Sequence, residues 1–125
     1  MDDVYIDTSA FLAVLNAGDE DHTKAASIWY NLLDTQACLV TNSFVLVETY
    51  ALIQNRLGLD AVRTFSRDIL PLLTVKQSLT SFLSSSRRDL SMVDCSSFTT
   101  MIQLGIIKVF TFDSHFSEQG FEVLI

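Results

Sequence analysis

The sequence predicts an α/β fold, with a central parallel sheet of about four to five short strands and helices on both faces. Short apolar segments alternate with segments of helical periodicity, and no hairpin turn signals separate them. The 125 residues are 49% hydrophobic and 18% charged, which is typical of a globular domain with one core. We therefore expect a single domain over residues 1–125, without a linker or an internal repeat.

The first strand and the first two helices are expected within the first 33 residues. Residues 4–7 are mostly apolar β-formers that end in an aspartate, and they predict a short buried strand. Thr8 and Ser9 supply cap chemistry for a helix that ends before Gly18. The acids at 19–21 place negative charge where a helix dipole favours it, so a second helix is expected to begin there. Its apolar stripe consists of Ala25, Ile28, Trp29, Leu32 and Leu33.

The middle of the chain repeats this strand-to-helix order. Residues 37–40 predict the second strand, and the polar segment 41–43 supplies cap chemistry for the helix that follows. That helix is expected to end before Gly58, since glycine is common just beyond a helix end. Asp60 is expected to cap another helix, which ends before Pro71, since proline cannot continue it.

The last third supplies the remaining elements. The Ser-rich segment 77–88 is predicted as a helix, and a further helix is expected from Ser91 to Leu104, with Gly105 after it. The remaining strands are expected at 72–75, 109–112 and 122–124.

The net charge of −7 limits how the protein could handle a nucleic acid. Contacts from Lys and Arg to phosphates supply most of the non-specific affinity for RNA or DNA, and an acidic protein has few of them to offer. If a nucleic acid is the substrate, positive charge has to come from another source. Metal ions could supply it.

Cellular location is predicted from the start of the chain and from its apolar segments. Met1, Asp2 and Asp3 make an acidic start where a secretion signal would be basic. No window resembles the roughly 20 apolar residues of a membrane span. We therefore expect a cytoplasmic protein that does not use a membrane, with Cys38 and Cys95 as reduced, buried thiols.

Four acidic residues are expected to meet at one edge of the sheet. Asp7 and Asp113 each close a predicted strand, and the carboxyl ends of parallel strands share an edge. Helices begin at this same edge. Glu48 lies six residues after Asn42, roughly 9 Å into its helix, and Asp94 lies in the first turn of another helix.

Four neighbouring carboxylates raise one another's pKa, so the cluster predicts bound cations. Oxygen ligands favour Mg²⁺, and Mn²⁺ also fits, whereas Zn²⁺ would favour Cys or His and Ca²⁺ a dedicated loop. Such a site leaves room for a phosphate and can promote the attack of water on it. We expect Asp7 and Asp94 to be the principal ligands, with Glu48 and Asp113 completing the site.

Each acid also has a structural explanation. Asp7 and Asp113 could cap a turn or a helix, and Ser91 with Asp94 matches the capping-box pattern. Glu48 could be a solvated helix residue, although its neighbours in "FVLVETYALI" are apolar on every side. The joint placement of the four acids favours a site.

Four segments in order resemble the PIN-domain ribonucleases, and especially the toxin subunits of VapBC toxin–antitoxin pairs. They span nearly the whole chain and read "IDTSAFLAVLNAGDEDHTKA", "TNSFVLVETYALI", "LSMVDCSSFTTM" and "FTFDSHFSEQGFEVL". The resemblance implies a metal-dependent endoribonuclease in which the catalytic and metal-binding acids are Asp7, Glu48, Asp94 and Asp113. It also implies that Ser9, with Thr8 beside it, supports the first acid. An antitoxin protein and a homodimer are the partners that it implies, besides the RNA substrate.

Other readings of the same residues remain open. A housekeeping RNA-processing nuclease would carry the same acids, and so would a PIN-like protein-binding module without activity. A haloacid-dehalogenase-type phosphatase is disfavoured, because Ser9 replaces the second acid of its DxD motif. We expect His115 to orient the loop after Asp113, and His22 and Cys95 to be structural. The pairs Arg63/Arg67 and Arg87/Arg88 are expected to be solvated or salt-bridged, although either could hold RNA phosphates.

Overall fold

A computed structural model describes residues 2–77 and 91–124 of the chain. Its sheet is five-stranded and entirely parallel, with the strand order β3-β2-β1-β4-β5. The strands are β1 (Asp3–Ile6), β2 (Cys38–Asn42), β3 (Leu73–Lys76), β4 (Lys108–Phe110) and β5 (Glu122–Val123). The predicted α/β fold with a parallel sheet is confirmed. The helix predicted over 77–88 lies almost wholly outside the described residues.

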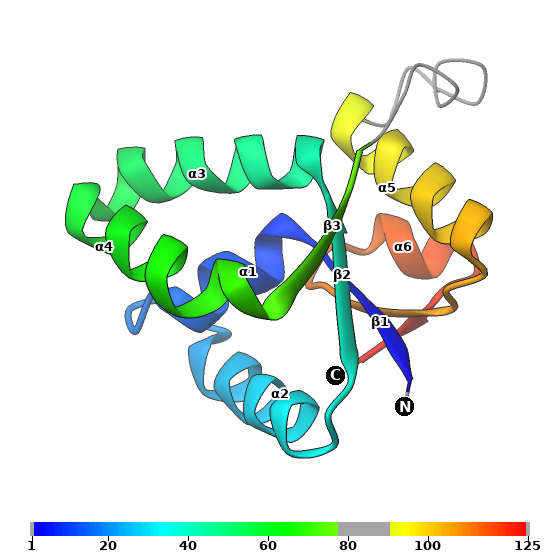
Figure 1. The fold of residues 1–125 in the computed structure, drawn as a ribbon, viewed down its shortest axis with the longest axis horizontal. Helices are drawn as coiled ribbons and strands as arrows, with labels where there is room; N and C mark the ends of the chain where they lie inside the picture. The colour runs from blue at the N-terminus through cyan, green and yellow to red at the C-terminus, as the bar shows by residue number, and fades with distance from the viewer. Residues whose placement is uncertain (1, 78–90, 125) are drawn as a thin grey trace.

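Helices cover both faces of the sheet, as Figure 1 shows, with α1 to α4 on one side and α5 and α6 on the other. The chain runs outward from β1 through β2 to β3, and then returns to the other side of β1 to form β4 and β5. The sheet therefore has its topological switch point between β1 and β4, where open α/β sheets commonly bind ligands. The helices are α1 (Thr8–Leu15), α2 (His22–Asp34), α3 (Ser43–Leu57), α4 (Leu59–Thr64), α5 (Met92–Leu104) and α6 (His115–Glu118).

Two of the predicted helix caps are present. The side chain of Asn42 accepts a hydrogen bond from the Val45 backbone N–H at 2.8 Å, at the start of α3. Ser91 Oγ accepts one from the Asp94 backbone N–H at 2.9 Å, at the start of α5. These caps fix where the helices that carry Glu48 and Asp94 begin.

Two other helix starts differ from the prediction. The residue that precedes α1 is Asp7, since β1 ends at Ile6, and its side chain makes no capping bond. The helix expected from the acids at 19–21 begins only at His22. Asp19 Oδ1 accepts from the Asp21 backbone N–H at 2.8 Å in the turn before the helix, and Asp21 is the residue that precedes α2, so the acids still place their charge at the helix start.

The helix predicted from Asp60 is divided into three pieces. Gly58 precedes α4 at φ 91°, so Asp60 lies in the first turn and is not the cap. After α4 the chain forms a π-helical turn over Phe65–Ile69 and a 3₁₀ turn over Leu70–Leu72, and β3 begins one residue later than predicted. Phe65 is fully buried, with its ring centroid 5.2 Å from that of Phe11.

Strand β4 is shorter at its carboxyl end than predicted. Its ladder stops at Phe110, because side chains take the next backbone donors. Ser9 Oγ accepts from the Phe112 N–H at 2.9 Å, and Thr111 Oγ1 accepts from the Asp113 N–H at 3.0 Å. The chain then turns into α6, a short helix that the sequence patterns do not predict.

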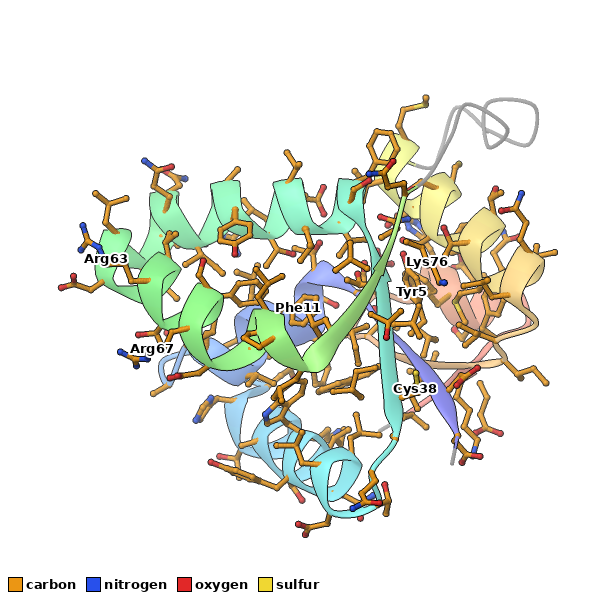
Figure 2. All side chains as sticks on the ribbon, in the orientation of Figure 1. Tyr5, Phe11, Cys38, Arg63, Arg67 and Lys76 are labelled. Atoms are coloured by element: carbon orange, nitrogen blue, oxygen red, sulfur yellow. The ribbon has the colours of Figure 1, made fainter. Side chains whose placement is uncertain are left out.

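The core lies between the sheet and the two helical layers. Tyr5 and Phe11, both labelled in Figure 2, are among the largest fully buried side chains. Cys38 and Cys95 are free thiols, of which Cys95 is buried as expected and Cys38 is only partly buried. In the part of the chain that the structure describes, no helix is long and apolar enough to span a membrane.

Candidate metal and catalytic site

Asp7 connects the end of β1 to the start of α1 at the switch point. Its backbone N–H donates to the Phe110 carbonyl at 3.1 Å, which extends the pairing of β1 with β4 by one bond. The side chain is only 4% exposed. Burial raises the pKa of Asp7 to about 6. A hydrogen bond from Thr111 opposes this rise, and the charges of Asp94 and Asp113 add to it.

Two hydroxyl groups hold the Asp7 carboxylate in place. Thr111 Oγ1 donates to Asp7 Oδ2 at 2.9 Å, and Ser9 Oγ lies 3.2 Å from the same oxygen. Ser9 therefore contacts Asp7, as its place in the sequence suggests. The backbone N–H of Thr8 also donates to the Asp7 carboxylate and opposes the rise of its pKa, while the Thr8 hydroxyl accepts from Thr49 Oγ1 at 3.3 Å. The sequence analysis missed Thr111, for which the available signal was a hydroxyl residue between two phenylalanines at the end of a strand.

Asp94 reaches the same region from the first turn of α5. The Ser91 cap bonds its backbone N–H, and its carboxylate faces His115 instead of completing a capping box. Burial and the charge of Asp113 raise the pKa of Asp94, and a hydrogen bond from His115 opposes that rise. The charge of Glu48 adds a smaller increase to the same pKa.

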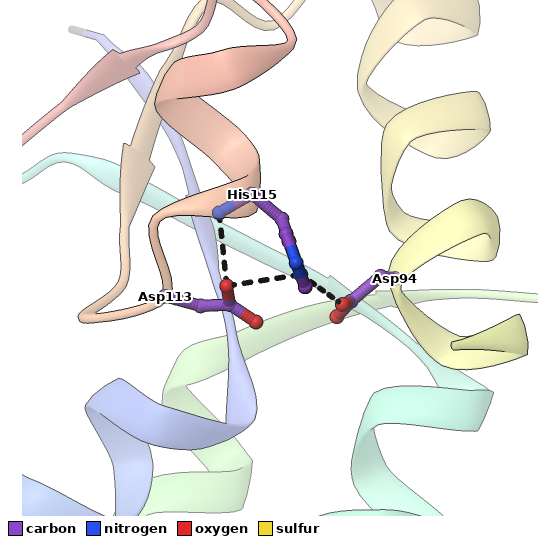
Figure 3. A group of neighbouring side chains, drawn as sticks. All are labelled: Asp94, Asp113 and His115. Atoms are coloured by element: carbon purple, nitrogen blue, oxygen red, sulfur yellow. Dashed lines mark hydrogen bonds and ion pairs between the residues drawn. The ribbon is translucent and has the colours of Figure 1, made fainter. Parts of the chain in front are cut away.

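Asp113 and His115 complete a compact group with Asp94, drawn in Figure 3. The His115 backbone N–H donates to Asp113 Oδ1 at 2.9 Å. His115 Nδ1 lies 3.2 Å from Asp113 Oδ1 and 3.2 Å from Asp94 Oδ2. A hydrogen bond to Asp94 and the charge of Asp113 raise the pKa of His115. The imidazole thus bridges the two carboxylates, besides holding the loop after Asp113.

The four predicted acids lie at one edge of the fold, but they do not all contact one another. One potential ligand atom from each of Asp94, Asp113 and His115 falls within 4.8 Å of the others, so these three residues could hold a metal ion. Asp7 is tied to Asp113 through Thr111, which bonds both residues. Glu48, partly buried on α3, lies outside the three-residue group and is coupled to Asp94 through its charge.

The chemistry of these donors fits a hard divalent cation. Asp7 is a buried carboxylate with a raised pKa, so its ionised form lacks compensating positive charge. Asp94 and Asp113 offer oxygen ligands of the kind that Mg²⁺ and Mn²⁺ prefer. Carboxylates that bind a metal ion are themselves hydrogen-bonded, which orients them, and His115 Nδ1 makes such a contact to both Asp94 and Asp113.

Fold and site together define a doubly wound α/β protein with a group of acids at its switch point that could hold a cation. The PIN-domain family model matches residues 4–122, and the chain therefore belongs to the PIN-domain family. This confirms the resemblance read from the four sequence segments.

One relative and one further protein of the same fold cover nearly all of the chain. The 23S rRNA-specific endonuclease VapC20 of Mycobacterium tuberculosis is 30% identical over 94% of this chain and 95% of its own length. The crystal structure of that VapC20, described as a Sarcin-Ricin loop cleaving toxin, superposes with a TM-score of 0.81 at 28% identity over 94% of this chain and 95% of that one. A VapBC2 structure from Rickettsia felis, bound to a promoter DNA fragment, shares the fold at a TM-score of 0.70 and 11% identity, covering 97% of this chain and 96% of that one.

Proposed function

We propose that this protein is a Mg²⁺-dependent endoribonuclease that hydrolyses RNA phosphodiester bonds. The observation that carries the proposal is the group of Asp94, Asp113 and His115 beside the buried Asp7, at the switch point of a PIN-domain sheet. A metal ion would supply the positive charge that a protein of net charge −7 lacks at its site.

In this proposal the catalytic acids are Asp7, Glu48, Asp94 and Asp113. The carboxylates of Asp94 and Asp113 would hold the cation, because these two lie in one compact group. Asp7, expected from the sequence as a principal ligand beside Asp94, would complete the acidic site together with Glu48. The ion, when bound, offsets the charge of the scissile phosphate and promotes the attack of water on it. His115 keeps both ligand carboxylates oriented, and the hydroxyls of Ser9 and Thr111 do the same for Asp7. Cys95 is only 2% exposed, so it does not serve as a nucleophile.

The substrate that we propose is a loop of ribosomal RNA. The support is the 30% identity to VapC20, whose names describe a 23S rRNA-specific endonuclease and a Sarcin-Ricin loop cleaving toxin. By the same relationship, we propose that the protein is the toxin of a toxin–antitoxin pair. The antitoxin would be a protein that binds this chain and blocks its activity.

Cleavage of a labelled sarcin–ricin hairpin by the purified protein tests the enzymatic proposal. We expect cleavage with Mg²⁺, loss of cleavage on adding EDTA, and recovery when excess Mg²⁺ is restored. The substitutions Asp7→Asn and Asp94→Asn should each abolish cleavage and leave the circular dichroism spectrum unchanged. Retained cleavage in both variants would rule out the assignment.

The matched control is Asp60→Asn, which removes one carboxylate from α4. Asp60 is fully exposed and pairs with Arg63 at 2.8 Å, away from the site. We expect this variant to cleave like the parent protein. A PIN-like binding module predicts a different result, namely no Mg²⁺-dependent turnover in any of the variants.

The toxin role is tested separately, by expression in cells. Induction of the parent protein should arrest growth, and induction of Asp94→Asn should not. Co-expression with the product of a neighbouring reading frame should restore growth, and the two proteins should co-purify. A housekeeping ribonuclease would cleave RNA without causing arrest and without such a partner.

A further inference from the structure

We propose that Lys76 binds a backbone phosphate of the RNA on the β3 side of the acidic site. This inference rests on the proposed ribonuclease function and adds a contact outside the group of acids. Lys76 is the last residue of β3, and its side chain is exposed. It therefore lies at the carboxyl edge of the sheet, the edge at which the acids gather.

The register of the sheet places Lys76 beside the helices that carry two of the acids. Lys76 pairs with Asn42 across β3 and β2, so their backbones lie about 4.8 Å apart. Asn42 Nδ2 donates to Ser96 Oγ at 3.1 Å and Thr100 Oγ1 at 3.2 Å on α5, and Asn42 also caps α3. Figure 1 shows that α3 and α5 both begin near the upper end of β3, and Figure 2 labels Lys76 to the right of that strand, on the side of α5.

Other cations of the described residues are already paired with acids. These pairs are Arg63 with Asp60 at 2.8 Å, Arg67 with Asp68 at 2.8 Å, and Lys108 with Asp2 at 2.6 Å. Lys108 is also the first residue of β4, so it lies at the opposite edge of the sheet. These side chains are thus poorly placed to meet an RNA strand that enters the site.

Two further described cations lie away from the carboxyl edge. Lys24 is near the start of α2, which leads to the amino end of β2. Arg56 is in the last turn of α3, about 20 Å along the helix from its start at the site. Among the Lys and Arg residues within 2–77 and 91–124, Lys76 is therefore the one that lies at the same edge of the sheet as the acids and is not paired with an acid of either range.

An RNA substrate needs more positive charge than a catalytic metal ion supplies. The ion acts on the scissile phosphate, while the neighbouring phosphates still face a protein of net charge −7. Because β3 is the edge strand of the sheet, a strand of RNA crossing that edge meets Lys76 on its way to the acids. A lysine there acts as a point charge that holds the backbone without reading the bases.

The test compares Lys76→Gln with Lys24→Gln, a matched change of an exposed lysine away from the site. In an Asp94→Asn background, binding of a fluorescently labelled RNA hairpin is measured by anisotropy over a series of KCl concentrations. We expect Lys76→Gln to weaken binding by roughly 5- to 10-fold at low salt and to lower the slope of log K against log salt by about one. Lys24→Gln should change neither quantity.

Kinetics with Asp94 intact give the second readout. Lys76→Gln should raise the KM for RNA and leave kcat within about twofold, because the contact is the same in the ground and transition states. Lys76→Arg keeps the charge and should keep the parent KM. Unchanged RNA affinity and an unchanged salt slope in Lys76→Gln would overturn the inference. Absence of cleavage by the parent protein would instead overturn the nuclease proposal, since the binding measurement does not depend on turnover.

Discussion

The side chains of Asp94 and His115 meet across the site although 21 positions separate them in the chain. His115 Nδ1 lies 3.2 Å from Asp94 Oδ2 and also 3.2 Å from Asp113 Oδ1. One imidazole therefore joins the first turn of α5 to the loop that follows β4. The protonated imidazole partly neutralises these two carboxylates, whose oxygens would bind the metal ion when it is present.

The first prediction concerns the protonation of His115 in the metal-free protein. The hydrogen bond to Asp94, followed by the charge of Asp113, raises its pKa above the usual 6.5. A bound divalent cation neutralises these carboxylates, so Mg²⁺ should lower the pKa of His115. Two-dimensional NMR of the histidine rings over a pH series, with and without Mg²⁺, measures the change.

Asp94→Asn provides the matched control for this titration. Removing the carboxylate removes the largest cause of the shift, so the pKa of His115 should fall in the metal-free variant. The ring of His22, which contacts the Ala13 carbonyl at 2.8 Å, serves as an internal reference whose signals should not respond to Mg²⁺. A His115 titration that is insensitive to both Mg²⁺ and Asp94→Asn would contradict the prediction.

The second prediction is that Asp7→Asn stabilises the metal-free protein at neutral pH. A carboxyl group whose pKa is raised from 3.8 to about 6 favours folding in its protonated form. That contribution is complete below pH 3.8 and is lost as the pH rises through about 6. A shift of roughly two units corresponds to about 3 kcal/mol, which sets the expected upper limit of the gain in unfolding free energy for Asp7→Asn.

Urea unfolding in EDTA at about pH 5 and about pH 7.5 measures the difference between Asp7→Asn and the parent. The difference should be larger at the higher pH, and saturating Mg²⁺ should reduce or reverse it. Asp60→Asn should alter stability by less than about 1 kcal/mol, because it breaks only an exposed ion pair. A destabilised Asp7→Asn protein at neutral pH without metal would refute this prediction.

The third prediction is a pH dependence of metal binding that Asp7 causes. If Asp7 has to ionise to help hold the cation, its pKa of about 6 makes the affinity rise with pH through that value. Calorimetric titration with Mn²⁺ in buffers of different ionisation enthalpy should detect release of the Asp7 proton near pH 6, besides the proton that His115 releases at higher pH when the cation lowers its pKa. In Asp7→Asn the residual binding should lose the proton release near pH 6 and keep the release from His115. If the variant released the same number of protons on Mn²⁺ binding as the parent, the pH dependence would belong to a group other than Asp7.

The sequence predicted the architecture and the acids for identifiable reasons. Alternating apolar strands and capped helices indicate a parallel sheet, and the caps at Asn42 and Ser91 fix where α3 and α5 start. Because those starts lie at the carboxyl edge, the acids that follow them could be assigned to the same edge as Asp7. Local patterns are sufficient for this step, since strand ends and helix starts are local features.

Long-range side-chain contacts were harder to predict. The end of β4 depends on Ser9 Oγ, which takes the Phe112 N–H from 103 positions away in the chain. Thr111 is the partner of Asp7 through a hydrogen bond between residues that lie 104 positions apart in the chain. The bridge that His115 makes requires α6, a helix of four residues that is too short for a periodic signal. Hydrogen bonds between side chains of distant segments have no sequence period, so pattern reading does not reveal them.

The last prediction is that Asn42 keeps the two acid-bearing helices in register. Its buried Nδ2 donates to Ser96 Oγ and Thr100 Oγ1, while its Oδ1 caps α3. Ser96 Oγ donates its own proton to the Val93 carbonyl at 2.6 Å, and Thr100 donates to the Ser96 carbonyl at 2.9 Å. Both hydroxyls therefore act as acceptors toward Asn42, so they need a donor such as its amide group and could not pair with a carboxylate at that position.

Asn42→Ser keeps an oxygen that can cap α3 and removes the two donors to α5. We expect it to reduce the unfolding free energy by roughly 1–3 kcal/mol and to weaken Mn²⁺ binding by several-fold, because Asp94 and Glu48 lose their common anchor. Ile53→Val is the matched control, since it removes one methyl group from a fully buried position of α3 and costs about 0.5–1.5 kcal/mol. If the contact positions the acids, Asn42→Ser weakens metal binding and Ile53→Val does not. Equal losses of metal affinity at equal losses of stability would mean that Asn42 supports only the fold.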